Sequence, residues 1–217
     1  MFFAVELMRL LEGLHRAGFI HGDMKIDNCL LRMEDVPGSA SAWDGTYSPA
    51  GDKGWRYKGI KLIDFGRTID TKLFPAKQQF IGDWPTDARD CLELRNGQPW
   101  TFQPDYFGLA GIIYCMLYGK YIETTSIILA PALEDGQQRY KLSTPFKRYW
   151  QGEIWSRLFN LLLNPTTIRS DGTLPLCDEM GVIREEMEVW LQANCNRASN
   201  TLKGLLKKIG LSLLGGK

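Results

Sequence analysis

The sequence predicts a mainly α-helical domain with a few short β-strands, an α+β fold overall. Three observations predict it: several long segments carry apolar residues at helical spacing, one segment is apolar on every side, and only two short apolar runs have the length of strands. Hydrophobic residues make up 44% of the 217 positions, so one domain of this length can bury a large core.

The first third of the chain predicts a helix, two short strands and a long loop. Apolar residues recur every three or four positions in residues 2–17, which predicts an amphipathic helix that ends at Gly18. Short strands are predicted at residues 29–31 and 60–63. Residues 33–59 hold five Gly, three Ser and two Pro, which predicts an inserted loop that is mobile in part.

The rest of the chain predicts an extended segment followed by helices. Residues 67–100 contain three prolines and no sustained period, so specific contacts must hold this segment. Residues 105–118 are nearly all apolar, which predicts a buried helix at the centre of the domain. Three more helices are predicted, at residues 149–163, 183–194 and 199–214. The last also carries lysines, and its spacing favours packing on the core over binding to a membrane surface.

Charge and cysteine content exclude several classes of function. Lys and Arg number 26 and Asp and Glu 25, so the net charge of +1 gives no bulk attraction to nucleic acid or to an anionic membrane. No apolar run reaches the roughly 18 residues that a membrane span needs. Five cysteines without a C-x-x-C pair argue against a disulfide framework or a zinc site. We therefore expect a soluble protein of a reducing compartment, with no direct nucleic-acid partner and no membrane partner.

One stretch carries the chemistry. The segment His21-Gly22-Asp23-Met24-Lys25-Ile26-Asp27-Asn28 is followed, 36 positions after Asn28, by Asp64-Phe65-Gly66. An Asp with an Asn five residues later, and a second Asp on a turn after a strand, is the layout that phosphoryl transfer requires. One carboxylate accepts or orients a hydroxyl proton, the second holds magnesium, and Lys25 reaches the same oxygens. Gly66 allows the tight turn that Asp64 needs.

These motifs fall in the order in which protein kinases carry them, and the chain resembles the larger C-terminal lobe of those enzymes. The resemblance implies a protein-kinase-like C-lobe whose short strands surround the catalytic loop and the metal-binding turn. It implies that Asp23 is the catalytic base and that Lys25 contacts the transferred phosphate of ATP. Asn28 and Asp64 would hold Mg²⁺, so the implied cofactors are ATP and Mg²⁺.

The same resemblance assigns structural roles. Asp105, at the start of the buried helix, would brace the catalytic loop, and Glu93 stands where kinases have the Glu of their Ala-Pro-Glu motif. Residues 64–93 would form the activation segment, which begins with Phe65 and Gly66. His21 is expected to brace the loop through packing and a backbone hydrogen bond. His15, in contrast, is expected on the surface of the first helix.

The resemblance narrows to the BUB family of mitotic spindle-assembly-checkpoint serine/threonine kinases, in its fungal branch. The sequences that carry it are His21-Gly22-Asp23, residues 62–75, Pro99-Trp100, residues 105–108 and residues 114–119. This implies a nuclear protein of the kinetochore that phosphorylates a chromatin or kinetochore protein. Other checkpoint proteins would bind through regions that these residues do not contain.

Two departures from common kinases matter physically. Gly22 replaces the arginine that binds a phosphorylated activation segment, so contacts of Leu73, Phe74, Phe80 and Trp84 are expected to hold the segment instead. No glycine-rich phosphate loop and no strand lysine occur in residues 1–217, which we interpret as a C-terminal lobe without its N-terminal lobe. The chain alone is therefore expected to bind ATP poorly and to have little kinase activity.

Two other readings stay open. Small-molecule phosphotransferases related to aminoglycoside and choline kinases share the His-Gly-Asp motif, but they usually have His where this chain has Lys25. They also have no need of the long segment from Asp64 to Glu93. The other reading is a pseudokinase or scaffold fragment that only binds checkpoint partners. The presence of all four residues of the expected site argues against degeneration, though not against a binding role.

Overall fold

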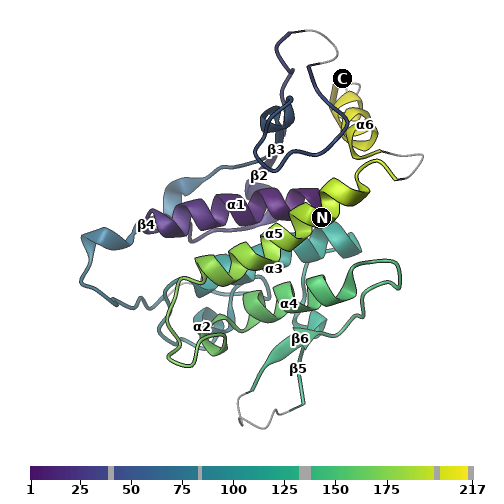
Figure 1. Ribbon diagram of the computed structural model, residues 1–217. Coiled ribbons are helices and arrows are strands. Elements are labelled where there is room, and N and C mark those ends of the chain that lie inside the picture. The colour runs from purple at the N-terminus through teal and green to yellow at the C-terminus, as the bar shows by residue number, and fades with distance from the viewer. Residues whose placement is uncertain (39–41, 83–84, 132–137, 198–200, 215–217) are drawn as a thin grey trace.

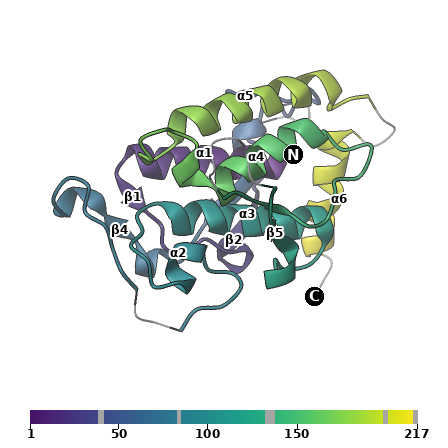
Figure 2. The same cartoon turned by 90° about the horizontal axis from the view of Figure 1, so that it is seen from below.

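Four helices form the body of the domain in the computed structural model, which describes residues 1–38, 42–82, 85–131, 138–197 and 201–214. Helix α1 (Phe2–Arg16) packs against α3 (Gln103–Tyr118) and α5 (Cys177–Asn194), and α4 (Gly152–Leu163) packs against α3 and α5. Figures 1 and 2 show these helices side by side. The predicted central helix is confirmed, because Tyr106, Leu109, Ile113 and Tyr114 of α3 are fully buried.

Helix α1 forms as its apolar spacing predicts. Its inward face includes Val5, Leu7 and Leu11. The helix ends at Arg16, and Gly18, two residues later, has the left-handed φ of +83° that ends the helical path. The expectation that His15 lies on the surface is wrong, since this residue is only 3% exposed. His15 follows Leu11 by four positions and therefore shares its buried face.

Three antiparallel strand pairs are attached to the helices. Strands β2 (Cys29–Met33) and β3 (Lys58–Leu62) pair with Leu31 opposite Ile60, close to the two predicted runs. The sequence did not predict the pair of β1 (Phe19–Ile20) and β4 (Ile69–Asp70), nor the hairpin of β5 (Ile127–Leu129) and β6 (Tyr140–Leu142). These strands are two or three residues long, too short to show a period of two.

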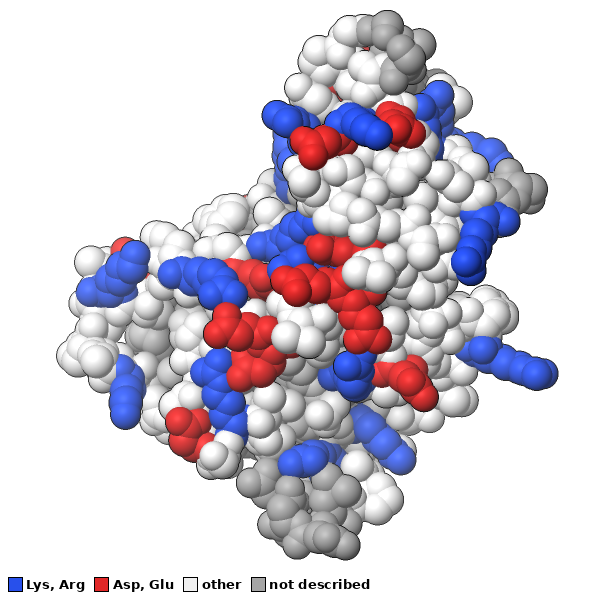
Figure 3. Space-filling view, viewed as in Figure 1, with Lys and Arg blue, Asp and Glu red and all other residues white. Residues whose placement is uncertain are grey.

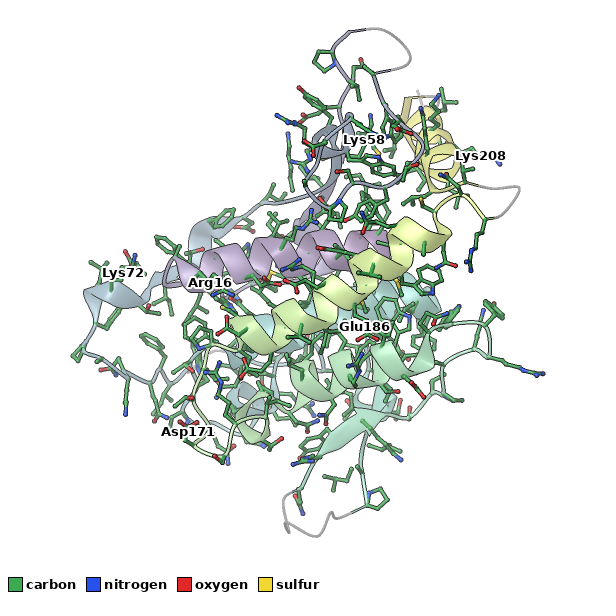
Figure 4. The ribbon with its side chains drawn as sticks, viewed as in Figure 1. Arg16, Lys58, Lys72, Asp171, Glu186 and Lys208 are labelled. Carbon is green, nitrogen blue, oxygen red and sulfur yellow. The ribbon has the colours of Figure 1, made fainter. Side chains whose placement is uncertain are left out.

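An aromatic cluster anchors the described part of the 33–59 loop. Trp55 packs against Phe2, Trp43 and Tyr47, with ring centroids 5.7, 5.6 and 5.3 Å away. Lys58 Nζ lies 4.7 Å from the Trp43 ring centroid, and Figure 4 shows this residue between the loop and α6 (Leu202–Leu214). The described part of the loop therefore extends the hydrophobic core through its aromatic side chains.

A chain of ion pairs joins α1 to α5. Glu188 Oε1 accepts from Arg9 Nη2 at 2.8 Å and from Arg184 Nη1 at 2.6 Å, and Arg184 Nε donates to Glu12 Oε1 at 2.8 Å. Figure 3 shows side chains of both signs gathered over these two helices. Because Glu12 and Glu188 are each only 7% exposed, their charges require these arginine partners.

The C-terminal part differs in length from the prediction. Helix α5 begins at Cys177, six residues before the predicted start, because Gly181 lies inside the helix and does not interrupt it. The short α2 (Leu92–Arg95) interrupts the segment that was predicted to be extended. Helix α6 packs on the core through Leu206, which is 2% exposed. In the described ranges, no helix combines the length and the apolar character that crossing a membrane demands.

Candidate active site

Two strand pairs bring the two predicted motifs together. Residues 21–28 connect β1 to β2, and residues 63–68 connect β3 to β4. Because β1 pairs with β4 and β2 pairs with β3, both ends of the two connections are fixed side by side. The Ile63 amide also donates to the Asn28 carbonyl at 3.0 Å. Residues that are 36 or more positions apart in the sequence thus form one site.

The Asp23 carboxylate is held on one side. Lys25 Nζ donates to Oδ2 at 2.7 Å, and Asn28 Nδ2 donates to the same oxygen at 3.0 Å and to the Asp23 carbonyl at 2.8 Å. Partial burial raises the pKa of Asp23, but the hydrogen bonds from Lys25 and Asn28 outweigh it and hold this pKa below its ordinary value. Asp23 is therefore ionised at neutral pH. Because both of these side-chain hydrogen bonds go to Oδ2, Oδ1 is better able to accept a hydrogen bond from a further donor.

The fully buried carboxylate of Asp105 supports the backbone of the catalytic loop. Asp105 Oδ2 accepts from the His21 amide at 2.7 Å and Oδ1 accepts from the Gly22 amide at 2.8 Å. His15 Nε2 lies 3.0 Å from Asp105 Oδ2, which makes His15 a residue of this network that the sequence did not indicate as one. The one available signal was its helical spacing from Leu11. The network fixes the backbone immediately before Asp23.

His21 connects the two halves of the site. The ring is fully buried, and Nε2 lies 3.2 Å from the Ile63 carbonyl while Nδ1 accepts from the Asp23 amide at 3.3 Å. These two bonds are compatible with the neutral tautomer that carries its proton on Nε2. The Phe65 ring lies 4.9 Å from the His21 ring. His21 thus joins the strand before Asp64 to the loop that holds Asp23.

Asn28 and Asp64, the two residues expected to bind the metal ion, lie on the two connections that His21 joins. Asp64 adopts a left-handed conformation with φ 62° and ψ 66°, which is rare for a residue with a side chain and is found at functional sites. Gly66 lies close to it, since a Cβ added there would be 3.3 Å from Asp64 Oδ1. The Asn28 amide nitrogen is committed to Asp23, so its oxygen is the atom that can bind a cation.

This donor set fits magnesium better than a transition metal. A carboxylate and an amide oxygen are ligands that Mg²⁺ accepts, and its other positions are normally filled by water and substrate phosphates. Within the described residues, no group of three or more His, Cys, Asp and Glu side chains is arranged to hold a metal ion. A site in which Asn28 and Asp64 share the metal ion with the phosphates of a nucleotide is compatible with this finding.

A cleft of about 420 Å³ opens beside Asp23. Its charged lining residues are Asp23, Lys25, Asp27, Arg67, Asp87, Arg89 and Asp90. Arg89 is bonded to both carboxylate oxygens of Asp87, with Nε 3.2 Å from Oδ1 and 3.1 Å from Oδ2. Glu93 does not line the cleft and lies in α2 behind it. The cleft thus lies between the catalytic loop and residues 85–94.

The predicted contacts of the activation segment are present in part. Phe80 pairs with Trp100 through two backbone hydrogen bonds of 2.8 and 2.9 Å, and its ring lies 5.1 Å from that of Phe74. Leu73 is 79% exposed, so the expectation that it holds the segment is wrong. Trp84 lies outside the described residues. The backbone bridge between Phe80 and Trp100, which the sequence did not predict, is the main support of this region.

The backbone geometry at residue 22 explains why this position holds glycine and not arginine. Its φ is +75°, and a Cβ added there would lie 2.7 Å from the Arg67 carbonyl oxygen. Such a distance is too short for any carbon–oxygen contact, so the backbones of the two motifs touch only because residue 22 has no side chain. Close approach and left-handed geometry both require glycine here.

Replacing Gly22 with alanine is expected to destabilise the protein by about 2–3 kcal/mol, because a backbone strain of about 1–2 kcal/mol is added to the clash. Urea unfolding followed by circular dichroism would measure this change. Gly97→Ala is the matched control, since Gly97 has φ +63° and no atom within 4 Å of an added Cβ, so only the backbone strain is introduced. Equal losses in the two variants would contradict the clash.

Comparisons with known proteins agree with this geometry. No family model matches the chain. It is 52% identical over 209 residues to the spindle assembly checkpoint serine/threonine-protein kinase bub1 of Schizosaccharomyces pombe, covering 96% of this chain and 19% of that protein. It is 46% identical over 188 residues to the corresponding kinase BUB1 of Saccharomyces cerevisiae, covering 87% of this chain and 17% of that protein. The chain thus spans less than a fifth of the length of these relatives.

A solved structure gives the same result for the fold. The BubR1 kinase domain superposes with a TM-score of 0.62 at 28% sequence identity, covering 87% of this chain and 49% of that one. About half of that kinase-domain chain is therefore matched. By sequence and by fold, the chain belongs to the BUB1 family of spindle checkpoint kinases and has the fold of a protein-kinase C-terminal lobe.

Proposed function

We propose that this chain supplies the catalytic loop of a serine/threonine protein kinase that transfers the γ-phosphoryl group of ATP to a protein hydroxyl. The observation that carries the proposal is the Asp23 carboxylate, which Lys25 and Asn28 hold through Oδ2 and which lines a cleft. A carboxylate held in this way is ionised and pre-oriented, which is what a residue that accepts a hydroxyl proton requires.

In the proposed reaction the substrate hydroxyl donates its hydrogen bond to Asp23 Oδ1. Its oxygen forms the new bond to the γ-phosphorus, the bond from that phosphorus to the β–γ bridging oxygen breaks, and the proton passes to Asp23. Lys25, which is 37% exposed at its side chain, can reach the oxygens of the transferring group. Asn28 and Asp64 would hold Mg²⁺, which neutralises charge on the phosphates when bound.

The surface around the site supports a role for an N-terminal lobe. Leu30, Leu31, Ile63 and Phe65 are between 37% and 50% exposed, and all lie on or beside the β2–β3 hairpin. Because successive strand residues point to opposite faces, Leu30 and Leu31 expose apolar surface on both sides of the strand pair, and such surface is typical of a region that another part covers. We propose that a nucleotide base and an N-terminal lobe cover it, and that residues 1–217 by themselves therefore transfer little phosphate.

The relatives' names support a proposal for the substrate and the place of action. Both fungal relatives are named as kinases of the spindle assembly checkpoint. We propose that the acceptor is a chromatin or kinetochore protein, that the protein acts at kinetochores in the nucleus, and that other checkpoint proteins bind outside this chain. The cleft beside Asp23 is also lined by residues between 85 and 94, where the long segment from Asp64 to Glu93 ends. A kinase acting on a small molecule such as an aminoglycoside or choline does not need this segment, so its presence at the cleft supports a protein substrate.

The test joins this chain to the N-terminal lobe of the fission-yeast relative and measures phosphate transfer to purified histones and kinetochore proteins. Asp23→Asn is expected to lower the rate by about 10²-fold or more, because it removes the proton acceptor while keeping the shape. Asp178→Asn is the matched control, since Asp178 is 80% exposed on α5 and is expected to leave the rate unchanged.

Three outcomes would reject the proposal. Full activity of the Asp23→Asn variant would exclude Asp23 as the base. Transfer to choline or an aminoglycoside, with none to protein, would favour the small-molecule reading. Partner binding by the reconstituted domain without any transfer would favour a scaffold.

A further inference from the structure

Arg67 is a charged residue of the cleft that the proposed mechanism does not use. It follows Asp64-Phe65-Gly66 directly and lies at the end of the short 3-10 helix Phe65–Arg67. Arg67 Nη1 lies 3.8 Å from Asp23 Oδ1, and the Arg67 side chain is 59% exposed. The guanidinium therefore lies near Asp23 Oδ1, whereas Lys25 and Asn28 donate hydrogen bonds to Asp23 Oδ2.

The backbone fixes Arg67 in this position. The Arg67 carbonyl oxygen packs on Gly22, where an added Cβ would be only 2.7 Å away. On the next residue, Thr68 Oγ1 donates to the His21 carbonyl at 3.4 Å, and Ile69 pairs with Ile20 across strands β4 and β1. Figure 2 shows these two strands together at one end of the domain. The missing side chain of Gly22 is thus what allows Arg67 to approach Asp23 so closely.

The pair between Arg67 and Asp23 contributes little stability by itself. An ion pair of 3.8 Å is longer than a hydrogen bond, and solvent screens a guanidinium that is more than half exposed. Lys25 and Asn28 already neutralise and orient the Asp23 carboxylate through shorter bonds of 2.7 and 3.0 Å. Arg67 therefore adds a second positive charge to a carboxylate that does not need one for its own burial.

The spacing suits a group placed between Asp23 and Arg67. Hydrogen bonds between ions are about 2.7–2.9 Å long, so two polar atoms 3.8 Å apart can both bond one small group between them. A hydroxyl on Asp23 Oδ1 would attack a phosphoryl group whose oxygens lie within reach of Arg67 on one side and Lys25 on the other. Guanidinium offers two parallel donors to such oxygens, which an ammonium cannot.

We propose that Arg67 and Lys25 form a two-cation cradle that binds the phosphoryl group during transfer, with Arg67 contacting its oxygens from the side of Asp23 Oδ1. This inference rests on the proposed function, since it deepens the same site. Arg67, which lines the cleft, would contact the phosphoryl oxygens directly. The sequence motifs do not predict this contact, and Asp23 and Asn28 do not make it.

Binding of inorganic pyrophosphate to the 217-residue chain tests the cradle without any need for activity. We expect Arg67→Gln to weaken pyrophosphate binding about fivefold or more in an NMR titration, because one charge-assisted contact is lost. Arg67→Lys should recover part of the affinity. Arg157→Gln is the matched control, since Arg157 pairs with Glu186 on the far helices and should bind as the parent chain does. Equal affinity of Arg67→Gln and the parent, or no pyrophosphate binding by the parent at millimolar concentrations, would overturn the inference.

Transfer by the domain joined to its N-terminal lobe gives a second readout. Arg67→Gln is expected to lower kcat by roughly 10²-fold with a small change in the KM for protein substrate, as for the loss of one donor to a developing charge. Added methylguanidine should restore part of the rate to Arg67→Ala, which a purely structural role would not allow. Normal kcat in Arg67→Gln, together with an inactive Asp23→Asn variant, would reject the cradle while leaving the proposed function intact.

Discussion

Replacing Asp105 with alanine is expected to destabilise the protein by about 4–5 kcal/mol and to abolish transfer by the reconstituted domain. The substitution removes the acceptor of the His21 and Gly22 amides and the partner of His15 Nε2, and the Asp105 side chain that it deletes is fully buried. A buried donor left without an acceptor costs about 1–3 kcal/mol, and breaking a buried charged cluster costs about 3–5 kcal/mol.

The shift of the urea unfolding midpoint would measure the stability loss, and phosphate transfer would measure the second effect. Asp178→Ala removes an Asp of equal size from a pair that is 56% and 80% exposed, so a change below about 0.5 kcal/mol is expected. The role of Asp105 as a brace would be excluded by a variant that unfolds like the parent chain.

Gly108→Ala is expected to cost about 3 kcal/mol, through the largest steric conflict that an added methyl group meets inside the helices. A Cβ on Gly108 would lie 2.3 Å from the Met24 carbonyl oxygen and 2.4 Å from Met24 Cβ. Helix α3 and the catalytic loop would have to separate, and overpacking of this kind costs about 1–3 kcal/mol or more. Since Met24 lies between Asp23 and Lys25, activity should fall with stability.

Gly111→Ala, one turn further along α3, provides the matched control. The added Cβ would lie 3.5 Å from Ile122 Cγ2, an ordinary contact, and alanine favours a helix over glycine by about 0.5–1 kcal/mol. We expect Gly111→Ala to leave the unfolding midpoint unchanged or slightly raised. A comparable loss in both variants, measured by urea unfolding, would mean that helix α3 tolerates no methyl group and would contradict a specific contact with Met24.

Long helices and local motifs were predictable because their signals are local. The helical spacing of residues 2–17 and the apolar segment 105–118 each extend over three or more turns, and the structure contains both helices close to those bounds. The loop before Asn28 and the turn at Asp64 were placed on the right elements, because both follow or precede short apolar strands.

Other features depend on contacts between distant parts of the chain. The strand pairs β1–β4 and β5–β6 were missed because each strand has only two or three residues, and its pairing partner supplies the hydrogen bonds. The glycine content of the 33–59 loop predicted an insertion, but it did not predict that Trp43, Tyr47 and Trp55 would pack its described part on α1. Composition counts the glycines but cannot show which aromatic side chains find a common pocket.

The sequence by itself determined the family of motifs: Asp23, Lys25, Asn28 and Asp64 in an order and spacing that suit phosphoryl transfer. Only the tertiary structure decided which groups surround them. His15 reaches Asp105 from α1, and Arg67 reaches Asp23 because Gly22 leaves room for the backbone to approach. Spacing along a chain fixes local geometry, whereas distances between side chains 40 to 90 positions apart follow from the packing of strands and helices.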